Sequence, residues 1–68
     1  MRKINTSLIG KQYKDRKSGA IFTVERGYII TDDLGNVERV YYKTVGKIGG
    51  LPCVHCDVCE LSIVKNLI

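Results

Sequence analysis

The chain has 68 residues, of which 44% are hydrophobic and 26% charged, and its formal net charge is +4. This length holds one domain, and the composition excludes a disordered chain. No run of about 20 apolar residues is present to span a membrane. The basic residues Arg2 and Lys3 are not followed by the apolar stretch of a signal peptide. We therefore expect one small domain over residues 1–68, with residues 1–9 as a candidate flexible N-terminal segment and no membrane attachment.

Glycines divide the chain into short runs rich in Val, Ile, Tyr, Phe and Thr, a pattern typical of strands joined by turns. Gly27 breaks or bulges the path between two of these runs, and the polar residues 32–36 predict the turn of an antiparallel hairpin. The tail from residue 59 fits either a terminal helix or a turn followed by a last strand. The predicted strands cover residues 11–14, 20–26, 28–31, 37–45 and 52–58.

About five short antiparallel strands in a chain of this length favour a closed barrel, because closure removes exposed strand edges. The arrangement Gly10-x-x-Tyr13, a polar loop to Gly19, Phe22-x-Val24 and then the hairpin turn resembles SH3-like barrels of the KOW and Tudor type. The chain is also similar to small phage-encoded accessory proteins, which are compact modules without a catalytic motif. The predicted fold class is all-β: a small five-stranded antiparallel SH3-like barrel with a short helical turn near the C-terminus.

Basic residues are concentrated in the first quarter of the chain, where Asp15 is the one acidic residue. This excess is typical of a surface that meets an acidic partner such as nucleic acid, and equally of a solvated surface. Tyr41 is predicted to face outward beside Arg39 and Lys43, because Tyr42 shares the opposite face with Val40. An outward tyrosine among cations can stack on a base or grip a peptide, or can reflect strand propensity alone. The candidate binding residues are Lys11, Lys14, Arg16, Lys17, Arg39, Tyr41 and Lys43.

The cysteines are crowded into one short segment that also holds the single histidine. Thiolates and imidazole are preferred zinc ligands, so Cys53, His55, Cys56 and Cys59 form a candidate zinc site, within one chain or across a homodimer. An extended segment would place Cys53 and His55 on one face and Cys56 on the other. The competing interpretation is an ordinary strand with Cys56 buried and His55 facing solvent, and no cofactor. An odd, crowded set of cysteines does not suggest a secreted disulfide framework, so we expect a cytoplasmic protein.

No catalytic residues are predicted, because one histidine without a positioned nucleophile does not make an active site and the glycine-rich residues 46–50 lack the order of a phosphate-binding loop. The expected function is a non-catalytic binding module for a protein partner, as a regulator or inhibitor of phage type. Binding of nucleic acid through the basic N-terminal face and a structural zinc module are the alternatives, and a homodimer is an open question. The apolar tail, residues 61–68, is expected either to pack on the domain or to offer a surface to a partner.

Overall fold

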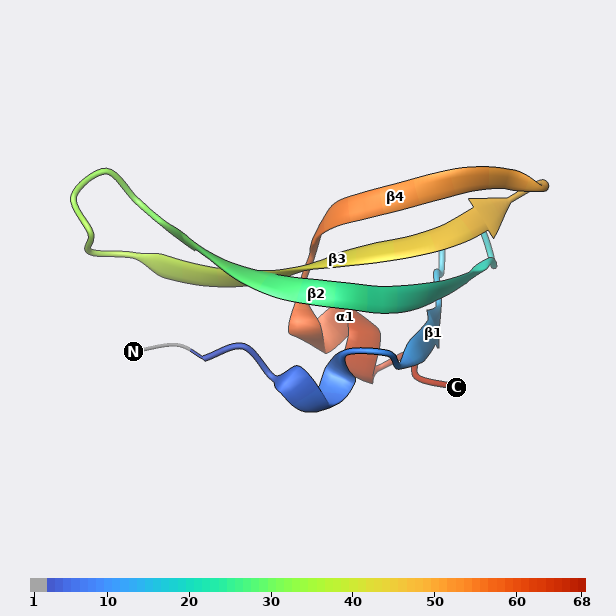
Figure 1. The fold of residues 1–68 in the computed structure, drawn as a ribbon, viewed down its shortest axis with the longest axis horizontal. Helices are drawn as coiled ribbons and strands as arrows, with labels where there is room; N and C mark the ends of the chain where they lie inside the picture. The colour runs from blue at the N-terminus through green and yellow to red at the C-terminus, as the bar shows by residue number, and fades with distance from the viewer. Residues whose placement is uncertain (1–2) are drawn as a thin grey trace.

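The computed structural model describes residues 3–68. One antiparallel sheet has the strand order β1-β2-β3-β4. A 3-10 helix, η1 (Thr6–Leu8), and an α-helix, α1 (Glu60–Val64), lie on the same side of the sheet (Figure 1). The strands are β1 (Gln12–Lys14), β2 (Ile21–Thr31), β3 (Glu38–Ile48) and β4 (Leu51–Val58). None of the helices in residues 3–68 has the length and apolar character needed to cross a membrane.

The predicted mostly-β architecture is confirmed, whereas the five-stranded closed barrel is wrong. The sheet has four strands and is open, because β1 and β4 are its two ends and do not pair. The predicted strands over residues 20–26 and 28–31 are one continuous strand, β2, in which Gly27 keeps its pairing with Tyr42 of β3. One strand fewer than expected is therefore available to close the sheet.

The tail combines both structures that its pattern allowed. Helix α1 comes first and buries Ile63 completely. The chain then returns to β1, where Leu67 forms an isolated antiparallel bridge with Tyr13. Two backbone hydrogen bonds flank this bridge, from Lys14 N–H to the Asn66 carbonyl at 3.0 Å and from Ile68 N–H to the Gln12 carbonyl at 3.2 Å. The outer edge of β1 is therefore covered by the tail.

The core lies between the sheet and the two helices. Phe22 and Val24 of β2 and Tyr42 of β3 contribute the buried side chains of the sheet, and the remaining buried apolar residues are Leu8, Tyr13 and Ile63. Thr44 is completely buried among them, and its hydroxyl is paired with the hydroxyl of Tyr13 at 2.9 Å. A buried hydroxyl costs stability unless it is hydrogen-bonded, so this pair fixes where β1 sits against β3.

Tyr42 connects the N-terminal segment and α1 to the sheet through hydrogen bonds of its hydroxyl group. Its hydroxyl accepts a hydrogen bond from Asn5 N–H and donates one to the Glu60 carboxylate, both at 2.9 Å. Burial is the main reason that the pKa of Tyr42 is raised; the hydrogen bond from Asn5 opposes this shift, and the Glu60 carboxylate adds to it. Within the N-terminal segment predicted to be flexible, Leu8 is buried in the core, and residues 1 and 2 lie outside the described residues.

Two register shifts interrupt the sheet. In β2, the pairing with β3 shifts between Val24 and Arg26, two residues before the position expected from Gly27. In β4, the pairing shifts so that Tyr42 lies opposite Val58 while Thr44 lies opposite His55. Each shift adds one unpaired residue to one strand and bends it. As a result, the far halves of β2 and β3 curve away from the core.

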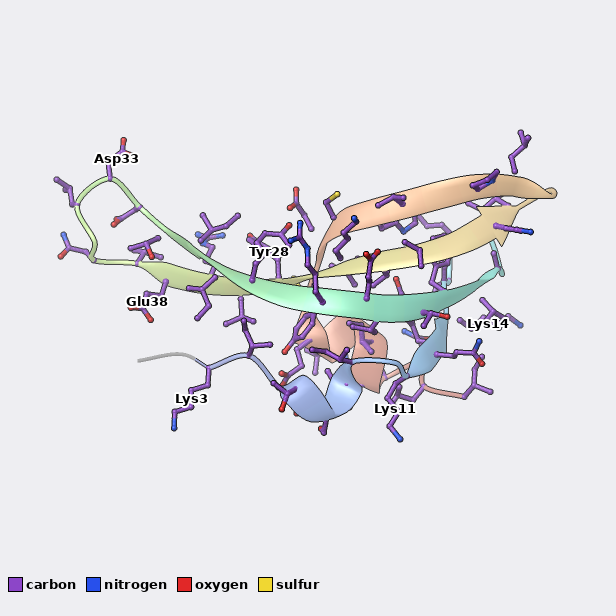
Figure 2. All side chains as sticks on the ribbon, in the orientation of Figure 1. Lys3, Lys11, Lys14, Tyr28, Asp33 and Glu38 are labelled. Carbon is purple, nitrogen blue, oxygen red and sulfur yellow. The ribbon has the colours of Figure 1, made fainter. Side chains whose placement is uncertain are left out.

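The far halves of β2 and β3 and their turn form a projecting hairpin, residues 29–39, which we call the arm (Figure 1). The predicted antiparallel pairing and turn are confirmed: Asp32 N–H bonds to the Val37 carbonyl at 3.0 Å, and Gly35 has φ of 72°. The arm gives the molecule an extent of 41 Å along its long axis against 21 and 17 Å across. Figure 2 shows Asp33 and Glu38 on the arm, with Lys11 and Lys14 at the opposite end.

Candidate binding grooves

A groove opens between β3 and α1, at the base of the arm. We call it the edge groove; it has a volume of about 740 Å³ and is lined by Lys3, residues 37–41, residues 59–61 and Val64. One wall is formed by residues 37–41, at the start of β3, and the other is formed by the start of α1. It exists because β4 ends at Val58 and the chain turns into the helix instead of continuing along β3.

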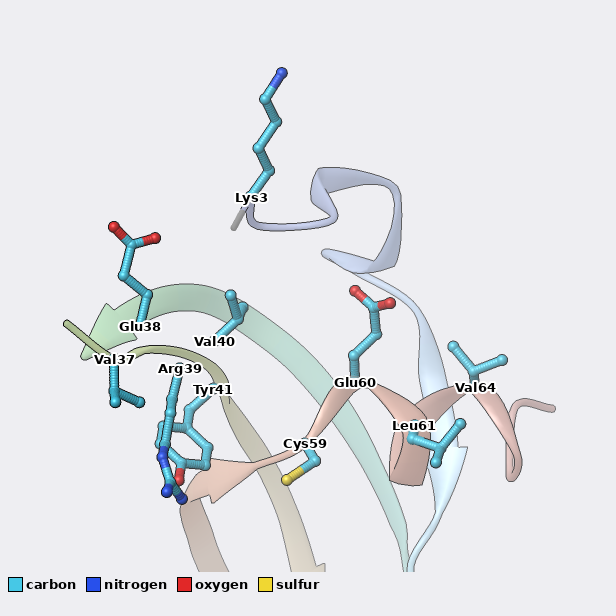
Figure 3. Close-up of a pocket in the computed structure, with 10 residues that line it drawn as sticks. All are labelled: Lys3, Val37, Glu38, Arg39, Val40, Tyr41, Cys59, Glu60, Leu61 and Val64. Carbon is cyan, nitrogen blue, oxygen red and sulfur yellow. The ribbon is translucent and has the colours of Figure 1, made fainter. Parts of the chain in front are cut away.

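The walls of the edge groove combine apolar side chains with the charged side chains of Lys3, Glu38, Arg39 and Glu60. Leu61 and Val64 are one helical turn apart on α1 and are 61% and 47% exposed, and Val37 on the other wall is 45% exposed. Figure 3 shows Tyr41 and Arg39 side by side on β3, with the Cys59 thiol nearby. The groove therefore combines exposed aliphatic surface with an aromatic ring and a cation.

A second groove, which we call the basic groove, lies between β1 with its following loop, the end of β4 and α1. It has a volume of about 650 Å³, and the basic side chains that line it are Lys14, Arg16, Lys17 and Lys65. Asp15 and Asp57 also line it. A hydrogen bond from the Ser18 hydroxyl at 2.7 Å is the main reason that the pKa of Asp15 is lowered, so this carboxylate is charged and offsets part of the surrounding positive charge.

The predicted binding residues fall into separate places. Lys14, Arg16 and Lys17 line the basic groove, and Arg39 and Tyr41 line the edge groove. Lys11 and Lys43 line neither groove; the Lys43 ammonium instead lies 3.5 Å from the Glu25 carboxylate on the open face of the sheet. Arg2 lies outside the described residues. The structure thus brings the basic loop and the Tyr41 region to two different grooves rather than to one surface.

The open face of the sheet carries a tyrosine pair. Tyr28 and Tyr41 are cross-strand partners whose ring centroids lie 6.2 Å apart. The Tyr28 hydroxyl donates to the Asp57 carboxylate at 2.6 Å and to the Cys56 carbonyl, and so it reaches across β3 to the register shift of β4. The hydrogen bond to Asp57 is the main reason that the pKa of Tyr28 is raised to about 12. The Tyr28 side chain is therefore held by its hydrogen bonds to β4, whereas Tyr41 lines the edge groove.

The cysteines and the histidine do not converge. Cys53 and His55 face the core side and Cys56 is exposed, as the strand alternation predicted, but the interpretation of Cys56 as buried and His55 as solvent-facing is wrong. His55 stacks on Phe22 with ring centroids 4.4 Å apart. Within residues 3–68, no group of three or more His, Cys, Asp or Glu side chains is placed to hold a metal ion. The zinc site stays a prediction.

Sequence reasoning did not find the edge groove as a site. A terminal helix from residue 59 was one of the two structures predicted for the tail, but the opposite wall depends on where β4 leaves the sheet, which no local pattern records. Comparison of the chain with protein-family models, curated proteins and solved structures finds no match. The resemblance to SH3-like barrels of the KOW and Tudor type therefore also stays a prediction.

Proposed function

We propose that this protein is a non-catalytic binding module and that it binds a protein partner through the edge groove. The observation that carries this proposal is the exposed aliphatic surface of Leu61, Val64 and Val37 beside the ring of Tyr41. Contiguous exposed apolar surface on a small domain marks an interaction site, because it is costly to leave in water. The mixture of an apolar floor, an aromatic ring and an arginine is also the composition typical of protein interfaces.

Nucleic acid is the second candidate, and the basic groove supports it. Lys14, Arg16, Lys17 and Lys65 line one concave surface, and such a cluster attracts phosphate groups. Two observations favour the protein partner. Asp15 and Asp57 lie in the same groove as these cations, and the ring of Tyr13, which also lines it, is buried and cannot stack on a base.

The test is affinity capture from extracts of the cells that make the protein, with three baits: the wild type, Leu61→Asp in the edge groove, and Leu34→Asp at the tip of the arm. Leu34 is 81% exposed and lies outside both grooves, so it is the matched control. We expect one protein to be retained by the wild type and Leu34→Asp and weakened about tenfold or more by Leu61→Asp. The affinity of the purified partner for each variant is then measured directly.

Two outcomes would contradict the proposal. Equal retention of every protein by all three baits would show that the edge groove is not the binding surface. Retention of RNA or DNA that is lost with rising salt and with Arg16→Glu, but kept with Leu61→Asp, would assign the function to the basic groove.

A further inference from the structure

We infer that the edge groove binds an extended peptide segment of the partner as an added strand, hydrogen-bonded to the exposed backbone edge of β3. This inference rests on the proposed function, because it names the form of the partner that the same groove would take. Strand addition to an open sheet edge is a general mode of peptide recognition, in which the backbone supplies affinity and the alternating side chains supply specificity.

The backbone edge of β3 changes along the strand. From Tyr42 onward, β3 pairs with β2 on one side and with β4 on the other, since the first residue pair with β4 is Tyr42 and Val58. Arg39, Val40 and Tyr41 pair with β2 on one side, and no β4 partner is present on the other. In an antiparallel strand, alternate residues turn their N–H and C=O groups toward opposite neighbours. This stretch therefore offers backbone donors and acceptors to the groove.

The groove has the position that an added strand requires. The chain at Cys59 is still extended, with φ of −78° and ψ of 147°, but it turns into α1 at Glu60. Figure 3 shows residues 37–41 on one side of the groove and Cys59, Glu60 and Leu61 on the other. A β4 strand continued past Val58 beside β3 would run between them. Neighbouring strands lie about 4.8 Å apart, and α1 forms the far wall of the resulting slot. An inserted strand would pair with β3 along one backbone edge, and its other edge would lie against Leu61 and Val64.

The side chains at the groove also define the chemistry of the peptide. Figure 3 shows Val40 pointing to one side of β3 and Arg39 with Tyr41 pointing to the other. Residues of an added strand alternate in the same way, so one set would meet Val40 and the other would meet Arg39. The first set is best apolar and the second best acidic, since Arg39 is exposed and its cross-strand partner on β2, Ile30, carries no charge to neutralise it. We therefore expect an extended segment that alternates β-branched apolar and acidic residues.

The other sheet edges suit a strand less well. The edge of β1 is occupied by the tail, through the hydrogen bonds to Asn66 and from Ile68. The outer edge of β4 carries Pro52, which has no N–H to donate, and the end of β4 borders the basic groove, which the charged side chains of Lys14, Arg16 and Lys17 line. At the edge groove, the unpaired backbone edge of β3 lies beside apolar side-chain surface.

The probe is a fluorescent heptapeptide that alternates valine and glutamate, with blocked ends. It is compared with two forms in which either the valine nitrogens or the glutamate nitrogens are methylated. In an extended peptide, all residues on one face direct their N–H groups to the same edge. Strand addition therefore predicts that one methylated form loses binding while the other, with identical side chains, keeps it. Binding is followed by fluorescence anisotropy on wild type, Leu61→Asp and Leu34→Asp.

Amide hydrogen exchange, measured by NMR on the same complexes, locates the added strand. We expect exchange to slow about tenfold or more at one or more of Arg39, Val40 and Tyr41 when the peptide is bound. Leu61→Asp should weaken the peptide about tenfold, and Leu34→Asp should leave it unchanged. The methylated peptides need no protein variant, so the test holds even if Leu61→Asp perturbs the fold.

Each other result overturns the inference. Equal binding of both methylated forms, or of neither, would exclude pairing through one peptide edge. Slowed exchange along residues 53–57 would place the strand on β4, and slowed exchange at residues 39–41 on concentrating the protein alone would assign the edge to a second copy. Absence of peptide binding, with a captured partner that still depends on Leu61, would leave the proposed function standing and remove strand addition.

Discussion

The two ends of the β2–β3 ladder have similar residues but different surroundings. In the body, Phe22 and Val24 of β2 and Thr44 of β3 are buried completely or nearly so. In the arm, Ile29 and Ile30 of the same strand are exposed to more than two fifths of their surface. The difference is cover: Leu8, Tyr13 and Ile63 of η1, β1 and α1 form one core cluster with the body, and among residues 3–68 that cluster does not include Ile29 or Ile30. Burial here is decided by what lies over the sheet, because the strand residues themselves are equally apolar.

The largest expected difference in stability between the body and the arm comes from removing a core side chain. Phe22→Ala deletes a ring that is fully buried and stacked on His55, and we expect it to lower the free energy of unfolding by about 3–5 kcal/mol. The matched change in the arm, Leu34→Ala, should change it by less than about 0.5 kcal/mol, because Leu34 is exposed. Urea unfolding followed by circular dichroism measures both. Equal losses would show that the arm contributes to the same core.

Glycine substitutions sharpen the contrast. At Gly46, an added Cβ would lie 2.6 Å from the Ile21 carbonyl oxygen and 2.9 Å from the Phe22 ring, so Gly46→Ala forces the backbone of the body apart. We expect a loss of about 1–3 kcal/mol. Gly35 in the arm has no atom within 4 Å of such a Cβ, but its φ is positive.

The arm control is therefore Gly35→Asn, since asparagine tolerates positive φ, and it should cost less than about 1 kcal/mol. Denaturation midpoints of the two variants and the wild type, measured under the same buffer conditions, make the comparison. A larger loss for Gly35→Asn than for Gly46→Ala would contradict the packing described for β2 and β3.

The smallest expected effect lies at the junction of body and arm and depends on pH. The pKa of Tyr28 is raised from 10.0 to about 12 in the folded protein, mainly by its hydrogen bond to Asp57. The stability that this bond contributes is present below the unfolded pKa and is lost as pH rises through the folded pKa. Wild type should therefore lose more stability between about pH 10 and pH 12 than Tyr28→Phe does.

Urea unfolding across that alkaline range measures the difference, and Asp57→Ala is the matched control, because it removes the acceptor and keeps the phenol. We expect Asp57→Ala to shift the alkaline loss toward that of Tyr28→Phe. The same alkaline loss in wild type and in Tyr28→Phe would mean that the bond across β3 does not form in solution.

Local patterns were sufficient for part of this fold. The turn at residues 32–36 was predictable because aspartate, asparagine and glycine each favour that backbone. The facing of Tyr42 inward and Tyr41 outward followed from alternation along β3, and the structure confirms it. The residues on the covered face of the sheet could thus be predicted in part from the sequence, since burial repeats every second residue within an unbroken strand.

The register shifts and the edge groove were not predictable in the same way. Gly27 was expected to interrupt β2, yet its missing side chain serves packing: a Cβ there would lie 3.0 Å from the Tyr42 ring. His55 was expected to face water, but pairing with Thr44 turns it onto Phe22. These facts depend on which strand lies beside which, and so does the point where β4 leaves β3 to open the groove.

The register shift in β2 has a consequence for how the arm can change during evolution. Glu25 is the extra residue between Val24 and Arg26, and it reverses which residues of β2 face the core side: Phe22 and Val24 before it, Gly27 and Ile29 after it. Loss of that single codon would place Arg26 directly after Val24, so regular alternation would continue and Gly27 would still lie opposite Tyr42. Loss of a codon from the regularly paired residues 27–31 would instead turn the later side chains of the strand to the other face. The bulge is therefore the position in β2 where a one-residue deletion is best accommodated, because the arm beyond it keeps both of its faces.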